Sequence, residues 1–139
     1  MNMQQDRNPQ ASRGFTLIEI LIALVIVAIV SSFAISSYQK SVLKSNRSAA
    51  KATLTKIASG EENWRFTHNS YTATVASVSG PIPANVSTIY SFTVAATAST
   101  YSAVATAIGG QLKDTDCTTF SISSTGAQSA TGNAASSCW

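Results

Sequence analysis

The feature that most constrains this chain is an apolar block close to its N-terminus. Residues 15–35 read FTLIEILIALVIVAIVSSFAI, in which Glu19 is the only charged residue. An α-helix of that length rises about 30 Å, which matches the hydrocarbon core of a bilayer. The core of a secretory signal peptide is shorter, roughly 7–15 residues, and a small-residue cleavage site follows it. The block therefore predicts a membrane segment, with a plain signal anchor as the alternative.

The rest of the chain differs in composition and is rich in Ser, Thr and Ala. Only 11% of the 139 residues are charged, against roughly 25% in a typical soluble domain. The length leaves room for one domain of ordinary size. This uneven distribution predicts a membrane segment joined to one polar domain. The net charge of +3 says little about function.

Basic residues flank the apolar block on both sides. Arg7 and Arg13 outweigh Asp6 before it, which favours a cytoplasmic N-terminus. The opposite flank is also basic, so the charge rule decides the orientation only weakly. Its basic residues are Lys40, Lys44, Arg47 and Lys51. In this orientation Cys117 and Cys138 lie outside the cytoplasm, where one disulfide can form.

Glu19 is unusual because it is a charged residue within an apolar block. A carboxylate costs about 2–3 kcal/mol at the bilayer centre and less near the interface, so it usually has a partner. Cleavage after Gly14 would give Phe15 a free α-amino group, four residues before Glu19. The amine and the carboxylate could then pair within one chain, or between neighbouring chains stacked with a small axial offset.

Residues 13–19, RGFTLIE, resemble the prepilin peptidase site of type IV pilins and type II secretion pseudopilins. The resemblance implies cleavage between Gly14 and Phe15, and N-methylation of Phe15 as the first residue of the mature chain. It also implies that Glu19 pairs with the N-terminal amine of a neighbouring subunit during assembly. Many major pilins carry a proline where this chain has Ser36, so we expect a more continuous helix here.

The resemblance also implies an α+β pilin fold. One long N-terminal helix, membrane-embedded in its first half, would pack against a small antiparallel sheet with a disulfide-bounded C-terminal loop. The expected parts are a cleaved leader (1–14), a membrane and filament-core half of the helix (15–36), an amphipathic half (37–68) and a head (69–139).

A heptad spacing of apolar residues predicts that the helix continues to about residue 67. It is set by Leu43, Ala50, Ile57 and Trp64, with Leu54 and Ala58 beside them. We expect Trp64 to pack in the core. Glu61 and Glu62 point about 100° apart on a helix, which does not suit acid–base catalysis, so we expect a solvated face. For His68 we expect a capping or surface role.

Residues 69–87 are expected to form an irregular connection, because Gly80-Pro81-Ile82-Pro83 interrupts any helix or central strand. Period-two patterns predict strands over 89–95, 101–108 and 118–123, arranged as an antiparallel meander with one face on the helix. The tail from residue 126 is expected to fray by itself. A Cys117–Cys138 bond would stabilise it by about 3 kcal/mol.

The disulfide-bounded ending resembles minor pilins of the PilE kind, which implies a structural subunit of a type IV pilus, serving adhesion or twitching motility. A type II secretion pseudopilin is the alternative, and such proteins more often keep a calcium site there. Asp114 and Asp116 alone fall short of the 6–8 oxygens that calcium takes, so we expect no metal. We also expect no cofactor and no catalytic residues, and hence no enzyme.

The expected partners are other pilin subunits, the prepilin peptidase and methylase, the pilus assembly platform and, before assembly, inner-membrane lipid. The head would lie in the periplasm first and on the extracellular pilus later. A DNA-uptake pilin is a third interpretation. It is disfavoured because Lys113 is the only basic residue from position 71 onward, and DNA binding needs a basic surface. Nucleic acid is therefore not an expected partner.

Overall fold

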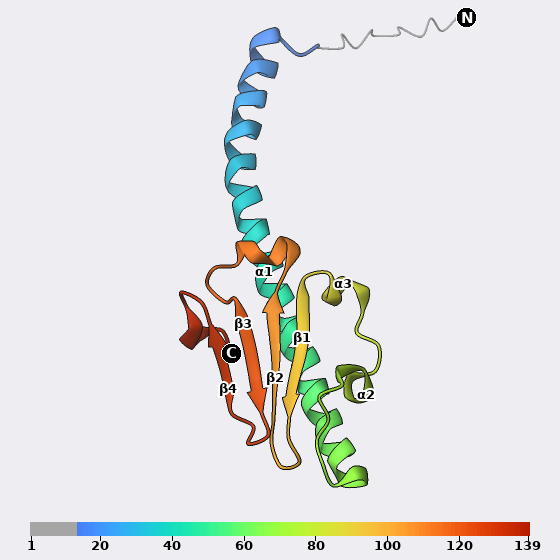
Figure 1. The fold of residues 1–139 in the computed structure, drawn as a ribbon. Helices are drawn as coiled ribbons and strands as arrows, with labels where there is room; N and C mark the ends of the chain where they lie inside the picture. The colour runs from blue at the N-terminus through green and yellow to red at the C-terminus, as the bar shows by residue number, and fades with distance from the viewer. Residues whose placement is uncertain (1–13) are drawn as a thin grey trace, which may run out of the picture. The chain divides into compact units, whose positions relative to one another are not determined.

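The computed structural model describes residues 14–139, so the predicted leader up to Arg13 lies outside the described residues. The chain divides between Tyr38 and Gln39 into two compact units. Helix α1 (Leu17–His68) runs through both (Figure 1). The long helix predicted from the apolar block and the heptad spacing is confirmed. Ser36 lies inside α1 without a break, as expected when serine replaces a helix-breaking proline.

The first unit contains the apolar part of α1. Its large side chains are exposed, with Phe15 and Leu17 both at 79%. The helix is long and apolar enough to cross a membrane, with a mean hydropathy of 2.8 over an 18-residue window. Such exposure is what a helix surrounded by lipid or by other apolar helices requires.

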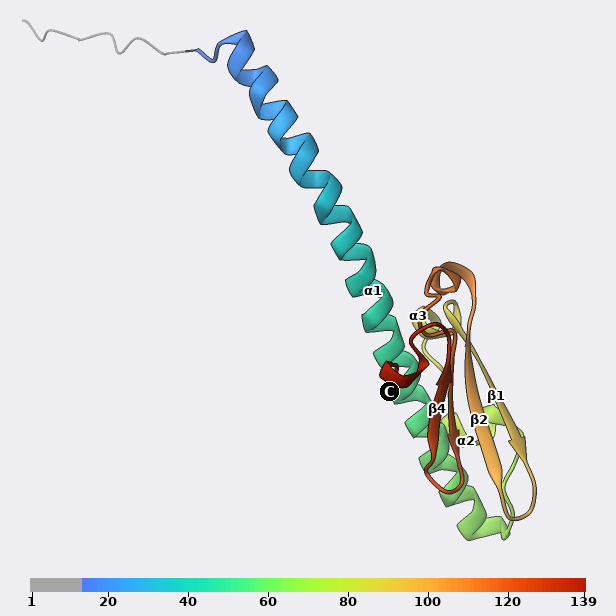
Figure 2. The same ribbon diagram turned by 90° about the vertical axis from the view of Figure 1, so that its left-hand side faces the viewer.

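The second unit, residues 39–139, contains one antiparallel sheet beside the second half of α1. Its strand order is β1 (Tyr90–Ala96), β2 (Tyr101–Ala107), β3 (Thr119–Ser123) and β4 (Gln128–Thr131). Each end of the first three strands lies within one residue of the prediction. Figures 1 and 2 show the sheet as a layer against α1.

The core of this unit lies between α1 and the inner face of the sheet. Ala50, Leu54 and Ile57 of α1 are fully buried, as are Tyr90 and Phe120 of the sheet. The strands alternate buried and exposed residues, so their opposite face is solvated. That outer face is rich in hydroxyl groups and carries no charge. Its Ser and Thr residues are Ser91, Thr93, Ser102, Thr106, Thr119, Ser121, Ser123, Ser129 and Thr131.

Two local predictions were wrong. Residues 69–87 are not wholly irregular, because they contain α2 (Val75–Ser79) and α3 (Ala84–Ser87). Glu61 does not face solvent: it is fully buried, because the 69–79 segment packs over it. The tail, which was expected to fray without its disulfide, forms β4 and the 3-10 turn η2 (Ala135–Ser137) in the disulfide-bonded chain.

Two residues near the end of α1 determine how that segment leaves the helix. Asn69 has a positive φ of 51°, a left-handed conformation that often ends helices. A Cβ on Gly60 would lie 2.0 Å from the carbonyl oxygen of Val78. Glycine at this position therefore lets α2 approach the backbone of α1 more closely than any other residue would allow.

Candidate functional sites

The start of α1 contains the predicted processing and assembly residues. Thr16 caps the helix: its Oγ1 accepts a hydrogen bond from the Glu19 backbone N–H at 3.3 Å. Gly14 and Phe15 precede the helix and are exposed. A Cβ on Gly14 would meet nothing within 4 Å, so nothing in this fold demands glycine there. Glu19 lies in the first turn, where the helix dipole favours a negative charge.

The Thr16 cap is one functional feature that the sequence analysis missed. Thr16-Leu17-Ile18-Glu19 fits the spacing of a capping box, in which Ser or Thr precedes Glu by three positions. That signal could have placed the helix start at Leu17 instead of Phe15. It also places Glu19 one helical turn from the Gly14–Phe15 bond.

A second site lies where the 3-10 turn η1 (Gly109–Lys113) meets α1. Arg47 donates two hydrogen bonds of 2.6 Å to the Asp114 carboxylate, from Nε and Nη2. Gln111 is fully buried. Its Oε1 accepts from Asn46 at 2.9 Å, and its Nε2 donates to the Leu43 carbonyl and to Asp114. This network fixes η1 on the helix.

Beside this network lies a recess of about 370 Å³ with basic walls. Lys40 and Lys44 line it from α1, and Lys113 lines it from η1. All three side chains are exposed. The sequence placed Lys113 alone in the head, and the fold brings it together with two lysines more than 60 residues earlier in the chain.

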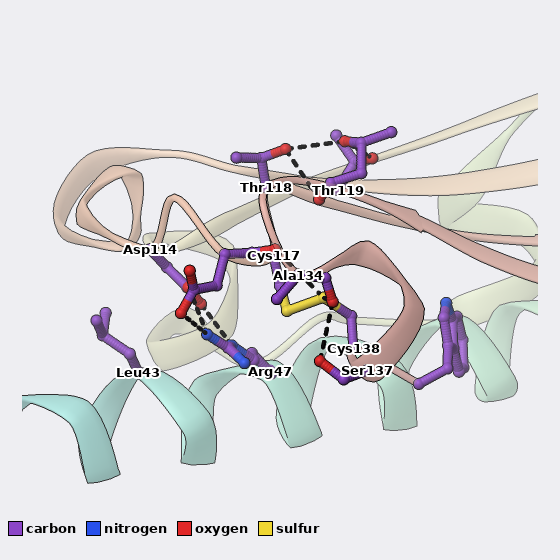
Figure 3. The surroundings of a disulfide bond; sticks show 12 residues. Leu43, Arg47, Asp114, Cys117, Thr118, Thr119, Ala134, Ser137 and Cys138 are labelled. Carbon is purple, nitrogen blue, oxygen red and sulfur yellow. Dashed lines mark hydrogen bonds and ion pairs between the residues drawn. A yellow bond between two sulfur atoms is a disulfide. The ribbon is translucent and has the colours of Figure 1, made fainter.

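The predicted disulfide is present and closes the C-terminal loop (Figure 3). The Cα atoms of Cys117 and Cys138 are 5.8 Å apart. Lys51 Nζ donates to the Cys138 carbonyl at 3.0 Å, and the Trp139 indole donates to the Ser129 carbonyl at 2.6 Å. Trp139 also meets Phe120 edge to face. The tail is thereby tied both to α1 and to β4.

A third cluster surrounds the last turns of α1. Glu61 accepts a hydrogen bond from the Thr72 backbone N–H at 3.0 Å, while its second oxygen, Oε1, has no hydrogen-bond partner within residues 14–139. Burial raises the pKa of Glu61. Tyr71 accepts from Arg65 and donates to Glu62. Burial also raises the pKa of Tyr101 to about 12.

His68 and Trp64 lie beside this cluster. Their rings stack 3.9 Å apart. His68 is exposed and Trp64 is partly buried against the core, in line with the surface and packing roles expected of them.

Within residues 14–139, no three His, Cys, Asp or Glu side chains gather as a metal site would require. Asp114 and Asp116, which were weighed as calcium ligands, both face Arg47, at 2.6 and 3.8 Å. A guanidinium between two carboxylates occupies the place that a cation would take.

Comparison with known families decides the identity of the chain. Residues 9–35 match the prokaryotic N-terminal methylation motif. Residues 36–121, more than half of the chain, match a family described as "Type IV minor pilin ComP, DNA uptake sequence receptor". The chain is a type IV minor pilin. None of the curated proteins searched matches it.

Membership of this family confirms the minor-pilin prediction and the α+β pilin fold, and it favours them over the type II pseudopilin alternative. Pilin families are structural and not enzymatic. The methylation motif together with the exposed apolar helix suits an inner-membrane anchor before assembly.

Proposed function

We propose that this minor pilin is a structural subunit of a type IV pilus, processed between Gly14 and Phe15 and methylated on Phe15. The observation that carries the proposal is the position of Glu19. It is the only charged residue of the apolar block 15–35 and lies one turn from an exposed peptide bond. After cleavage, the Phe15 amine of one subunit would pair with Glu19 of its neighbour, and in an apolar surrounding such a pair strongly favours one stacking offset.

The partners in this sequence of events are the prepilin peptidase, the assembly platform and other pilins. The head would stand in the periplasm while the apolar half of α1 is anchored, and would reach the cell exterior with the filament. The disulfide supports this placement, because such bonds persist outside the reducing cytoplasm.

The test is a Glu19→Gln variant, which keeps the side-chain shape and removes the charge. Mass spectrometry should find its N-terminus at methylated Phe15, while its amount in sheared filaments falls at least about tenfold, a loss of 1.4 kcal/mol or more. Ser32→Ala, within the same apolar segment, is the matched control and should assemble normally. Wild-type incorporation of Glu19→Gln, or a mature chain that keeps Gly14, would contradict the proposal.

Capture of DNA is a second candidate function, and the family match favours it. Lys113 is the only basic residue from position 71 onward, but the head does not begin there. The compact unit 39–139 includes the second half of α1, and with it seven basic and four acidic residues. The positive charge that phosphate contacts need therefore resides on α1 and η1, while the outer face of the sheet offers neutral hydroxyl groups.

The full-length chain in neutral detergent provides the test. With three phosphate contacts, affinity for duplex DNA should fall roughly 40-fold between 50 and 200 mM salt. Fluorescence anisotropy would measure this, with fragments of the source organism's own DNA compared against unrelated DNA of equal length. If DNA affinity did not change with salt concentration, or if no DNA bound at 50 mM salt, the DNA function would be ruled out. The proposed structural function would not be affected.

A further inference from the structure

One feature of the chain has no role in assembly through Glu19: the lysines that follow the apolar segment. Membrane proteins place excess Lys and Arg on the cytoplasmic flank, yet here Lys40 and Lys44 follow the end that leads to the disulfide-bonded head. Anionic phospholipid headgroups attract basic residues beside a membrane segment by about 1 kcal/mol each.

The structure turns these two lysines into part of a concave site. Lys40 and Lys44 lie four residues apart on α1, and so on one side of the helix. Lys113 of η1 joins them around the recess of about 370 Å³. The recess is thus lined by lysines from two chain segments, and such an arrangement suits an anionic group the size of a phosphate.

The recess is built on a rigid support. η1 is fixed to α1 by the Arg47–Asp114 ion pair and by the buried Gln111. Asp114 is 2% exposed and turned to Arg47, so it does not neutralise the lysines. Asp116, which is 60% exposed, is the other carboxylate that lines the recess. The three exposed lysines outweigh it, and the recess is positive.

An exposed apolar side chain is the chain neighbour of one of these lysines. Leu112, next to Lys113 in η1, is 65% exposed although it is large and apolar. Cations beside an exposed leucine are the pattern of membrane-interface contacts, where the leucine enters the acyl boundary and the cations meet phosphates. Free phosphate offers nothing apolar for Leu112 to contact, and duplex DNA presents its apolar groups mainly inside its grooves and not beside its phosphates.

We propose that this recess binds the phosphate of an anionic phospholipid headgroup, with Leu112 touching the acyl chains, while the subunit is anchored in the membrane. The inference rests on the proposed function for one point, that the head lies beside a bilayer before assembly. Lys40 follows the apolar segment by only a few residues, so this wall of the recess is close to the membrane segment along the chain.

The experiment uses the full-length chain in neutral detergent, where no filament forms, so that it does not depend on assembly. Native mass spectrometry would measure binding of phosphatidylglycerol and of phosphatidylcholine with the same acyl chains. We expect at least about tenfold preference for phosphatidylglycerol. Lys113→Gln should reduce this preference about fivefold. Leu112→Ser, added to Lys113→Gln, should weaken phosphatidylglycerol binding further. Lys56→Gln, an equal change of charge elsewhere on exposed α1, should leave it unchanged.

Several results would overturn the proposal. Equal binding of the two lipids would show that the recess does not recognise the anionic headgroup. If Lys56→Gln reduced binding as much as Lys113→Gln does, the lipid would be attracted by the overall charge of the protein and not by the recess. The recess would instead be a site for free phosphate if millimolar inorganic phosphate displaced the lipid fully and Leu112→Ser had no effect on lipid binding. Displacement by duplex DNA that depends on Lys113 would assign the recess to DNA. Failure of Glu19→Gln to block assembly, by contrast, would leave this result untouched.

Discussion

Arg47 and Asp114 are 67 positions apart in the chain and form a two-point ion pair, with both hydrogen bonds at 2.6 Å. The Asp114 side chain is 2% exposed and that of Arg47 is 20% exposed. The hydrogen bond to Asp114 raises the pKa of Arg47 above its ordinary value. The pair ties η1 to α1 (Figure 3). It lines the same recess as the three lysines, so it supports both the fold and the recess.

Removing only the arginine should destabilise the head strongly. Arg47→Gln leaves the Asp114 carboxylate buried without its cation, which should cost about 3 kcal/mol in the free energy of unfolding. Chemical denaturation of the detergent-solubilised chain measures this. Replacing both partners, as Arg47→Met with Asp114→Leu, should recover most of the loss. Lys56→Gln is the control, with an expected change within about 0.5 kcal/mol. A loss equally small for Arg47→Gln would mean that the pair is dispensable.

The sequence was informative wherever a pattern repeats along one element. The apolar block and the heptad of Leu43, Ala50 and Ile57 predicted α1, and alternation predicted three strands. The polar network around Gln111 could not be predicted in this way, because its members come from α1 and η1 and only the fold joins them. The same holds for the recess, since a charge count along the chain separates Lys113 from the helix lysines.

β4 escaped prediction because its sequence, Gln128–Thr131, shows no apolar alternation. It pairs with β3 because the disulfide and the Trp139 indole hold the tail in place. Replacing both cysteines by serine should therefore lower the free energy of unfolding by about 3 kcal/mol. Hydrogen exchange should show loss of protection first in β4 and η2. Ser137→Ala serves as the control in the same loop. Unchanged protection of β4 in the serine variant would show that the bond is not what orders the tail.

Glu61 was expected in solvent, and its burial depends on a segment that no helical pattern reveals. Desolvation raises its pKa, the Thr72 N–H lowers it, and Glu62 raises it. An acid with a raised folded-state pKa binds its proton more tightly in the folded state. Its contribution to stability is therefore complete below the unfolded pKa and is lost as the pH rises through the folded pKa.

Glu61→Gln should abolish the loss of stability with rising pH. It should also stabilise the head at pH 7 by about 1 kcal/mol, because no charge is then buried. The amide oxygen can still accept from Thr72. Melting temperatures between pH 4 and 8 would measure the slope. Glu62→Gln removes a neighbouring exposed carboxylate and should keep most of the slope. A Glu61→Gln variant that melts lower than wild type at pH 7, or keeps the slope, would refute this account.

Gly60 also shows what the sequence alone could not reveal. A glycine inside an exposed helix costs about 1 kcal/mol relative to alanine, so from sequence a Gly60→Ala change looks stabilising. The structure reverses that sign, because the new Cβ would lie 2.0 Å from the Val78 carbonyl oxygen and 2.7 Å from its carbon. The helix or α2 would have to move, and both are held by the buried residues between them.

We therefore expect Gly60→Ala to lower the free energy of unfolding by about 2 kcal/mol, since overpacking against backbone outweighs the gain in helix propensity. Gly110→Ala is the matched control, because a Cβ there meets nothing within 4 Å and should change stability by less than about 0.5 kcal/mol. Denaturant titration of both variants shows whether Gly60→Ala stabilises or destabilises the head.

Separation of α2 from α1 should also expose Glu61, so hydrogen exchange at Thr72 should accelerate in Gly60→Ala and not in Gly110→Ala. A stabilised Gly60→Ala variant would show that α2 is loosely attached to the helix.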